Sequence, residues 1–179
     1  MTKALLVIDI QNDYFPGGLM QLVGSTEAAQ QAARLQAQFR QDANPVINVQ
    51  HVALSPSATF FLPNSKGAEI HESVAPIEGE PVIVKHHPNA FRETELKKVL
   101  DELTVDELVV VGMMTHMCID TTVRAASDMG LKVTLVADAC ATKNLEFAGV
   151  EVSAANVQAA YLAAIDRSFA KVVSAEELL

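Results

Sequence analysis

The sequence predicts an α/β fold, a three-layer, doubly wound arrangement around a six-stranded, mostly parallel sheet. Short runs of β-branched apolar residues alternate along the chain with amphipathic helical patterns, which is the order that a parallel sheet requires. These runs are apolar throughout, as in strands that are buried on both faces. No internal repeat or linker interrupts the 179 residues, so residues 1–179 are expected to form one domain.

The first half of the chain is expected to supply three strands and two helices. The strands cover residues 4–8, 46–49 and 82–84. Pro81 opens the third strand, a position at which proline is tolerated. Residues 26–40 repeat apolar side chains at helical spacing behind Ser25 or Thr26 as N-cap, and residues 93–103 show the same spacing.

The second half is expected to supply the remaining strands and helices. Strands cover 108–111, 133–136 and 171–173, and helices cover 119–129 and 153–169. Gly112 is interpreted as the end of the fourth strand, and Gly130 as the C-terminal stop of the helix before it. Ser153 is the expected cap of the last long helix. Ser174 and Glu177 have the spacing of a capping box for a terminal turn.

Residues 52–80 do not fit the short connections of such a fold. They join the second strand to the third without a convincing helical pattern, and they contain three prolines and two glycines. Loops of this length in a compact domain are usually functional lids or disordered segments. Because Phe60 and Phe61 favour packing over disorder, we expect the loop to fold over the active site or into a subunit interface.

Composition narrows the classes of partner. The net charge of −9 and the lack of a basic cluster argue against nucleic acid and anionic membranes. No apolar run approaches the roughly 20 residues of a membrane helix, and the N-terminus lacks a signal-peptide pattern, so a cytoplasmic location is expected. The two cysteines, Cys118 and Cys140, form no disulfide framework. A small-molecule substrate is the partner that remains.

Three chemically active side chains are expected at one edge of the sheet. Asp9 follows the first strand, Lys85 ends the third, and Cys118 follows the fourth. In open parallel sheets, ligands bind beyond the carboxyl ends of the strands. Taken singly, the three also fit a turn residue, a snorkelling lysine and a small buried hydrophobe. Together they predict a nucleophile with an acid–base partner and a cation that favours a thiolate.

Cys118 is the expected nucleophile because of its place in the chain. It lies where the fourth strand, a turn and a helix N-terminus meet. A helix N-terminus presents free N–H groups and partial positive charge, both of which lower the pKa of a cysteine. The same amides can bind a developing oxyanion. Cys140 has no neighbouring cation in the sequence and is interpreted as structural.

Five histidines raise the question of a metal site. None of them forms an H-x-x-x-H or D-x-H pair, and adjacent His86 and His87 point to opposite faces of an extended segment. We therefore expect no metal and no other cofactor, with a set of His51, His71 and His87 left open. No G-x-G-x-x-G follows the first strand, which argues against a dinucleotide.

Four segments resemble the isochorismatase-like cysteine hydrolases, a family that includes nicotinamidases and N-carbamoylsarcosine amidases. The segments are LVIDIQNDYF at 6–15, VKHHPNAF at 84–91, VGMMTHMC at 111–118 with Thr122 and Arg124, and VADACAT at 136–142. The resemblance extends over about residues 4–173. It implies a Rossmann-like, isochorismatase-like fold and an amidase-like hydrolase that acts on carbon–nitrogen bonds other than peptide bonds.

The resemblance also implies roles for particular residues. It implies a catalytic triad of Asp9, Lys85 and Cys118, in agreement with their placement. It implies a cis peptide between Met113 and Met114, with the amides of Met114 and Cys118 forming an oxyanion hole. It further implies a homo-oligomer, a dimer or tetramer, in which the long loop can meet a neighbouring subunit.

Two departures from the family narrow the reaction. Nicotinamidases carry a D-x-H pair after the second strand, where this chain reads NVQHVA over 48–53, so nicotinamide is disfavoured as the substrate. Isochorismatases proper lack the catalytic cysteine, so Cys118 disfavours vinyl-ether hydrolysis. The expected function is cysteine-dependent hydrolysis of a small-molecule amide or other C–N bond through a thioester.

In the expected mechanism, Asp9 takes the thiol proton, Lys85 stabilises the charges, Cys118 attacks the carbonyl, and water hydrolyses the thioester. The candidate substrate-binding residues are Gln11, Phe15, His51, Phe60, Phe91, Thr115 and His116. One alternative is a noncatalytic member that binds a ligand as an oligomer, and another is a vinyl-ether hydrolase. An aspartyl-phosphate phosphatase is disfavoured, because Gln11 stands where that chemistry needs a second aspartate.

Overall fold

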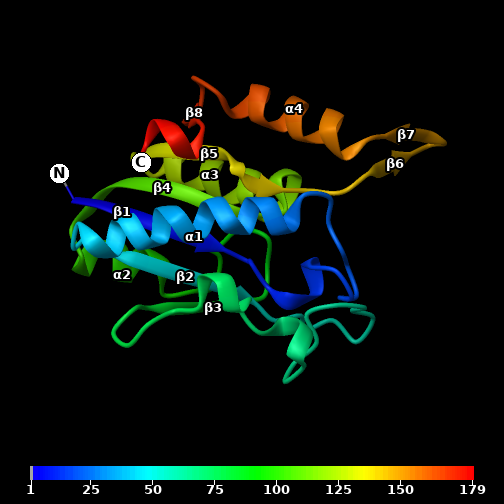
Figure 1. The fold of residues 1–179 in the computed structure, drawn as a ribbon, viewed down its shortest axis with the longest axis horizontal. Helices are drawn as coiled ribbons and strands as arrows, with labels where there is room; N and C mark the ends of the chain where they lie inside the picture. Colours follow the sequence, from blue (N-terminus) through cyan, green and yellow to red (C-terminus); the bar gives the residue numbers. More distant parts are fainter. Residues whose placement is uncertain (1) are drawn as a thin grey trace.

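A six-stranded parallel sheet lies at the centre of the computed structural model, which describes residues 2–179 (Figure 1). The strand order is β3-β2-β1-β4-β5-β8, and every neighbouring pair is parallel. The strands are β1 (Thr2–Ile8), β2 (Val46–His51), β3 (Val82–Lys85), β4 (Val105–Met113), β5 (Lys132–Ala141) and β8 (Lys171–Val173). The predicted α/β fold with a doubly wound parallel sheet is therefore confirmed.

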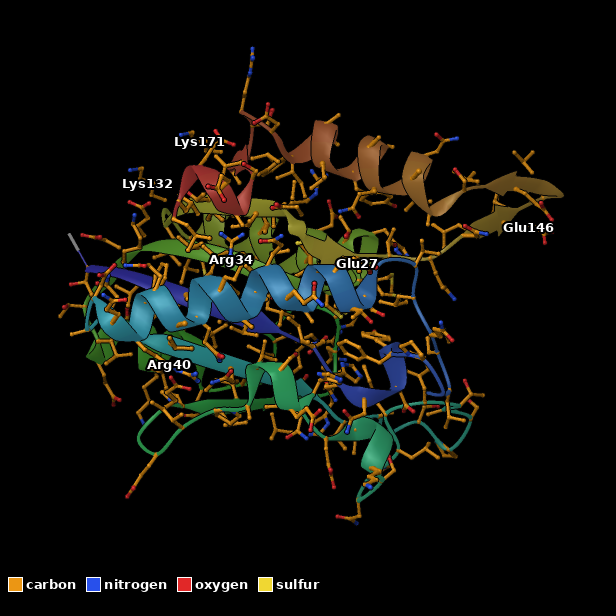
Figure 2. The ribbon with its side chains drawn as sticks, in the orientation of Figure 1. Glu27, Arg34, Arg40, Lys132, Glu146 and Lys171 are labelled. Carbon is orange, nitrogen blue, oxygen red and sulfur yellow. The ribbon has the colours of Figure 1, made fainter. Side chains whose placement is uncertain are left out.

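Helices cover both faces of the sheet, so successive side chains of a strand enter two separate cores. On β1, Leu5 and Val7 face the core under α1 (Ser25–Gln41), whereas Leu6 and Ile8 face the core under α2 (Leu96–Glu102) and α3 (Asp120–Asp128). The last helix, α4 (Ala154–Ile165), runs beside α3. Figure 2 shows Glu27 and Arg34 on α1, where both are exposed. No helix of the described residues is both long and apolar enough to span a membrane.

The strand order reverses between β1 and β4. From β1 the chain builds outward to β2 and β3 on one side, then returns to place β4, β5 and β8 on the other. Such a reversal opens a crevice beyond the carboxyl ends of the two central strands, where ligands bind in this class of sheet. Asp9 directly follows β1, and Cys118 lies five residues beyond β4, so both belong to this crevice.

Gly112 does not end its strand, contrary to the prediction. It lies inside β4, opposite Ile8 of β1, with a φ of +135°. A Cβ at this position would lie 2.0 Å from the Ile8 carbonyl oxygen. The glycine is therefore required by the close approach of two backbones, and β4 continues to Met113. Strand β5 is likewise longer than predicted and includes Cys140.

The helix ends agree with the prediction only in part. Gly24, with a φ of +75°, is the N-cap of α1, so the expected Ser25 or Thr26 cap is wrong. The predicted cap of α4 is confirmed, because the Ser153 hydroxyl accepts a hydrogen bond from the Asn156 N–H at 3.3 Å. The capping box at the C-terminus is present as well. Helix α2 starts later than expected and α4 ends earlier.

A two-stranded hairpin, absent from the prediction, extends from the body of the molecule between β5 and α4 (Figure 1). It consists of antiparallel β6 (Leu145–Phe147) and β7 (Val150–Val152). Its turn residues, Ala148 and Gly149, both have positive φ. Strands of three residues are too short for their alternation of apolar and polar side chains to predict a strand.

The long loop, residues 52–80, packs against the segment that follows β1. It contains two short 3₁₀ turns, at Lys66–Ala68 and Glu72–Val74. The N–H of Asn12 donates to the Glu69 carbonyl at 3.1 Å, and the N–H of His71 donates to the Ile10 carbonyl at 2.9 Å. The loop therefore lies over the edge of the sheet at which Asp9 emerges.

Candidate active site

Three elements bring Asp9, Lys85 and Cys118 together. The Lys85 Nζ lies 2.7 Å from Oδ2 of Asp9 and 3.2 Å from Sγ of Cys118. The side chains of Asp9 and Lys85 are both completely buried, and Cys118 is 6% exposed. The three side chains therefore lie together, as inferred from the strand ends. Their catalytic roles stay a prediction.

Lys85 has more hydrogen-bond acceptors around it than protons to donate. Besides Asp9 and Cys118, its ammonium contacts Nδ1 of His51 at 2.9 Å and the carbonyl of His87 at 3.1 Å. Burial by itself lowers the pKa of Lys85, but the neighbouring Asp9 carboxylate, followed by Cys118, raises it above its ordinary value. The side chain is therefore a fixed ammonium with three donors for four acceptors.

The carboxylate oxygens of Asp9 can accept further hydrogen bonds. Its backbone has a positive φ of 52°, and its N–H donates to the Val49 carbonyl at 3.0 Å. Oδ2 is ion-paired with Lys85, but neither carboxylate oxygen accepts a well-directed hydrogen bond from the described residues. A buried oxygen of this kind normally has a partner. The thiol proton of Cys118 is the natural candidate, since Asp9 and Cys118 offer atoms within 4.8 Å of each other.

Cys118 lies in a π-helical turn, Thr115–Ile119, that leads directly into α3. Turns of this type occur frequently at functional sites. The peptide between Met113 and Met114, just before the turn, is cis, as the family resemblance implied. The role of the Met114 and Cys118 amides in binding an oxyanion stays a prediction.

The pKa of Cys118 is raised, so the lowering that was expected from the helix N-terminus is wrong. Burial is the largest influence and raises the pKa of Cys118 far above its ordinary value, and the charge of Asp9 raises it further. Lys85 lowers the pKa but does not outweigh them. Because the helix turn is buried, desolvation dominates the effect of the helix N-terminus. Cys118 is a neutral thiol at rest. Burial also raises the pKa of Cys140, to about 12.

His51 is the predicted pocket residue that lies nearest to the triad. Burial and the Lys85 ammonium lower its pKa to about 4, so the imidazole is neutral near pH 7. Its Nδ1 then accepts a hydrogen bond from Lys85, and the ring proton resides on Nε2. The backbone of His51 is held by Gln11, whose amide donates to the His51 carbonyl and accepts from the His51 N–H, both at 2.8 Å.

Gln11 and Thr115 use their side chains in bonds to the protein itself. Besides its bonds to His51, Gln11 donates to the carbonyl of Ala68 in the long loop at 2.7 Å. The Thr115 hydroxyl donates to Gln158 Oε1 at 2.6 Å and contacts the Ala141 carbonyl at 3.2 Å. Both residues are completely buried. These contacts assign them to holding the loop and the turn in place.

The other predicted pocket residues make contacts with residues outside the triad or pack in the core. Phe15 is buried and stacks on His71, with ring centroids 3.7 Å apart. Phe60 is partly buried against Phe61, and Phe91 packs against the core that contains Cys118. His116 contacts the Thr142 hydroxyl through Nδ1 at 2.6 Å, and burial lowers its pKa.

Tyr14 and Asp13 were missed by the sequence reasoning, which selected their neighbour Phe15. Tyr14 packs edge-on against Phe61 at 4.6 Å between ring centroids. Burial raises its pKa, and negative charge at Cys118, Asp9 and Asp13 raises it further. The Asp13 carboxylate accepts the Phe61 N–H at 2.7 Å, so it fastens the loop. The one feature of the sequence that could have pointed to Asp13 and Tyr14 is their position in the segment that follows the first strand.

A resident metal does not fit this site. Within residues 2–179, one group of potential ligands gathers, namely Asp9, His51 and Cys118, with atoms within 4.8 Å of one another. The Lys85 ammonium contacts all three, at 2.7, 2.9 and 3.2 Å, and therefore occupies the position of the cation. The set of His51, His71 and His87 that the sequence left open does not gather.

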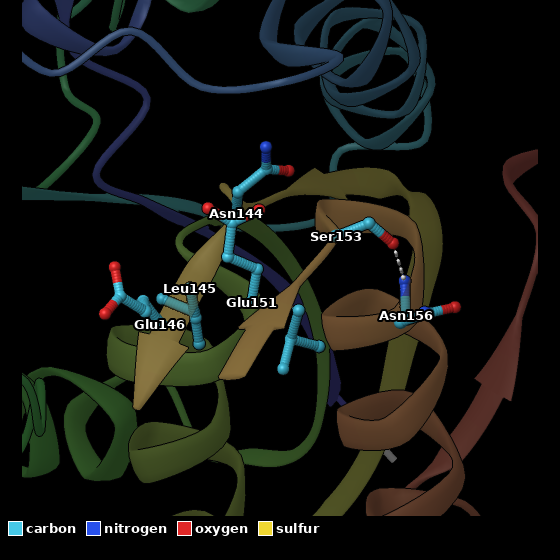
Figure 3. A pocket seen from close by; sticks show the side chains of 7 residues that line it. Asn144, Leu145, Glu146, Glu151, Ser153 and Asn156 are labelled. Atoms are coloured by element: carbon cyan, nitrogen blue, oxygen red, sulfur yellow. Dashed lines mark hydrogen bonds between the residues drawn. The ribbon is translucent and has the colours of Figure 1, made fainter. Parts of the chain in front are cut away.

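Several hollows lie on the surface of the molecule, and one of about 560 Å³ lies between the segment after β1 and the long loop, beside Phe15 and His71. A second hollow of about 520 Å³ lies beside the hairpin, between Asn144, Glu151 and Ser153 (Figure 3). Another of about 330 Å³ lies between the start of α1 and α4. None of the triad residues lines any of them.

Comparison with known proteins gives consistent matches over nearly the whole chain. A model of the isochorismatase domain matches residues 3–177. An uncharacterised isochorismatase family protein of Bacillus subtilis, YddQ, is 52% identical, covering 100% of this chain and 99% of that protein. The nicotinamidase of Escherichia coli is 28% identical over 80% of this chain and 85% of its own length.

A solved structure has nearly the same fold. The crystal structure of an isochorismatase hydrolase from Oleispira antarctica superposes with a TM-score of 0.96 and 53% sequence identity. The match covers 99% of this chain and 95% of that one.

Proposed function

This chain belongs to the isochorismatase family of hydrolases, and we propose that it hydrolyses a small-molecule amide or related carbon–nitrogen bond with Cys118 as nucleophile. One observation carries the proposal. A single buried ammonium, that of Lys85, contacts both a carboxylate at 2.7 Å and a thiol at 3.2 Å. The similarity to a nicotinamidase supports an amide as the bond cleaved.

The proposed reaction begins with the neutral thiol. Asp9 accepts the proton of Cys118, and the thiolate attacks the substrate carbonyl while Lys85 stabilises the negative charge. The amides of Met114 and Cys118 are proposed to bind the oxyanion. Asp9 then returns the proton to the departing amine, and water hydrolyses the thioester.

A panel of amides, ureas and carbamoyl compounds, assayed by ammonia release, tests this function. We expect turnover of at least one compound by the wild type and none above background by Cys118→Ala. Cys140→Ala is the matched control, because Cys140 is also buried but has no contact with Lys85 among the described residues. Full turnover by Cys118→Ala, or hydrolysis of no compound by the wild type, would reject the proposal.

We also propose that the chain forms a homo-oligomer in the cytoplasm, with contact through the hairpin and α4. The twelve residues of α4 include no charged side chain. In the hairpin, Phe147 is 84% and Val150 63% exposed, and the two are paired across the strands. An isolated two-stranded hairpin is at best marginally stable in water. A second copy covering this apolar face would stabilise it.

Mass photometry of the wild type and of Phe147→Lys tests the assembly. We expect the wild type to be a dimer or larger and the variant to dissociate. Leu54→Lys is the matched control, because Leu54 is 66% exposed in the long loop, away from the hairpin. A monomeric wild type, or a variant that assembles as the wild type does, would contradict the proposal.

A further inference from the structure

His51 lies beside the triad, but the reaction as proposed above gives it no step. Its ring, Asp9 and Cys118 offer atoms that all lie within 4.8 Å of one another. Its Nδ1 faces inward to the Lys85 ammonium at 2.9 Å. Among residues 2–179, Nε2 has no hydrogen-bond partner. The only fully buried side-chain polar atoms without a partner in these residues are the two Asp9 oxygens, so Nε2 is not fully buried. Nε2 is therefore accessible to a ligand.

Lys85 does not need His51 in order to be satisfied. Without Nδ1, its three protons still have Asp9, Cys118 and the His87 carbonyl at 2.7, 3.2 and 3.1 Å. The contact has a clear effect in the opposite direction. Because Nδ1 accepts from an ammonium, the neutral ring must carry its proton on Nε2. Lys85 thus fixes the tautomer of His51 and presents an N–H donor at the mouth of the site.

We propose that His51 Nε2–H is a substrate-recognition donor, which selects neutral amides that carry a hydrogen-bond acceptor two bonds from the scissile carbonyl carbon. This inference rests on the proposed function of Cys118. The scissile carbon bonds to Sγ, and one nitrogen of the His51 ring lies within 4.8 Å of Sγ, so a donor on the same ring can reach atoms attached to that carbon. Such an acceptor is a carbonyl oxygen or an unprotonated ring nitrogen.

The surroundings favour a neutral and planar acyl group. The Lys85 ammonium is fully engaged, so it offers no spare cation for a substrate carboxylate. Phe61 lies 5.9 Å from the His51 ring between centroids, and Tyr14 and Phe60 pack on Phe61 at 4.6 and 4.9 Å. Phe61 and Tyr14 are buried, whereas Phe60 is half-buried, so its ring can lie against a flat acyl group. Together with a single neutral donor, this ring fits an aromatic or heteroaromatic amide.

Three probes of nearly the same shape, two of which are isomers, separate hydrogen bonding from ring electronics. Pyridine-2-carboxamide carries a ring nitrogen next to the carboxamide, pyridine-4-carboxamide carries it at the far side of the ring, and benzamide carries none. We expect kcat/KM of the wild type for the 2-isomer to exceed that for the other two by about five- to tenfold, as one neutral hydrogen bond gives.

Two variants at one position divide the roles of the imidazole. His51→Gln places an amide N–H near the position of Nε2 and keeps the donor. His51→Asn places an oxygen near the position of Nδ1 and keeps only the acceptor toward Lys85. The backbone bonds between residue 51 and Gln11 are the same in both. We expect His51→Gln to retain the preference for the 2-isomer and His51→Asn to lose it, with similar thermal unfolding midpoints.

The outcomes separate this inference from the proposed function. A preference retained by His51→Asn, no preference in the wild type, or turnover of none of the three probes by an enzyme that hydrolyses another amide through Cys118 would overturn the role of His51 alone. Hydrolysis that persists in Cys118→Ala would instead overturn the proposed function, and with it the premise of this inference.

Discussion

Replacing Lys85 by methionine tests the buried ion pair on which the site is built. The side chains of Lys85 and Asp9 are both 0% exposed, and Nζ lies 2.7 Å from Oδ2. The variant therefore leaves the Asp9 charge buried without a counter-ion, which costs about 3–5 kcal/mol of folding free energy. In a chain of 179 residues, each kcal/mol moves Tm by about 2–4 °C, so we expect Tm to fall by roughly 6–20 °C.

Urea unfolding followed by circular dichroism at neutral pH measures this cost. Lys97→Met is the matched control, because Lys97 and Asp101 form an exposed pair on α2, and we expect its loss to cost only about 0–0.5 kcal/mol. Adding Asp9→Asn to Lys85→Met removes the stranded charge and should recover at least about 2 kcal/mol. A Lys85→Met variant less than about 1 kcal/mol below wild type, or no recovery in the double variant, would refute the reasoning.

The pH dependence of the same free-energy difference has a definite sign. Burial lowers the pKa of Lys85, but Asp9 and Cys118 raise it above its ordinary 10.5. A group with a raised folded-state pKa contributes its full stability below its unfolded-state pKa and loses it as the pH rises through the folded-state value. The stability difference between wild type and Lys85→Met should therefore be constant near neutral pH and shrink above pH 10.5.

Burial also predicts how three other side chains respond to change. Because burial raises the pKa of Cys118, iodoacetamide at pH 7 should alkylate it more slowly than in the urea-unfolded chain, and equal rates by mass spectrometry would contradict a buried, protonated thiol. Burial and Lys85 lower the pKa of His51 from 6.5 to about 4, so the unfolded chain binds a proton in that window that the folded chain does not. The urea midpoint should fall there more for wild type than for His51→Asn, and a parallel decline would rule this out. Asp13→Ala removes the acceptor of the Phe61 N–H, which the carboxylate holds at 2.7 Å. This should cost about 1–3 kcal/mol and speed proteolysis within residues 52–80, and unchanged cleavage would show that the carboxylate does not hold the loop.

The triad could be located from sequence because its position follows from topology alone. Asp9, Lys85 and Cys118 each follow an apolar strand, and parallel strands end at one edge of a sheet. The direction in which a polar side chain at this edge points cannot be predicted from the order of the strands. Gln11 and Thr115 stand at the same edge, but their polar groups bond to the loop and to α4. The apolar pattern does not predict where these two segments lie relative to the edge.

The state of the thiol was misjudged because two effects of position oppose each other. A helix N-terminus lowers the pKa of a cysteine and burial raises it, and only the first is visible in the sequence. The depth of burial depends on how the long loop closes over the site, through contacts such as that between Asp13 and Phe61. The hairpin was missed for a related reason, since its two strands have three residues each and its apolar residues cover nothing within the described chain.

If Cys118 is the nucleophile, its ionisation moves a negative charge over a short path that stays within reach of one cation. Before proton transfer the charge is on Asp9, 2.7 Å from the Lys85 Nζ, and afterwards it is on Sγ, 3.2 Å from the same atom. The ammonium can direct its protons to whichever atom is charged, because His51 Nδ1 and the His87 carbonyl accept those that remain. Fixed charges that need no rearrangement are the usual source of electrostatic catalysis. The burial that keeps the thiol protonated at rest therefore also keeps water from competing for Lys85, and it strengthens the field that the ammonium exerts on the thiolate.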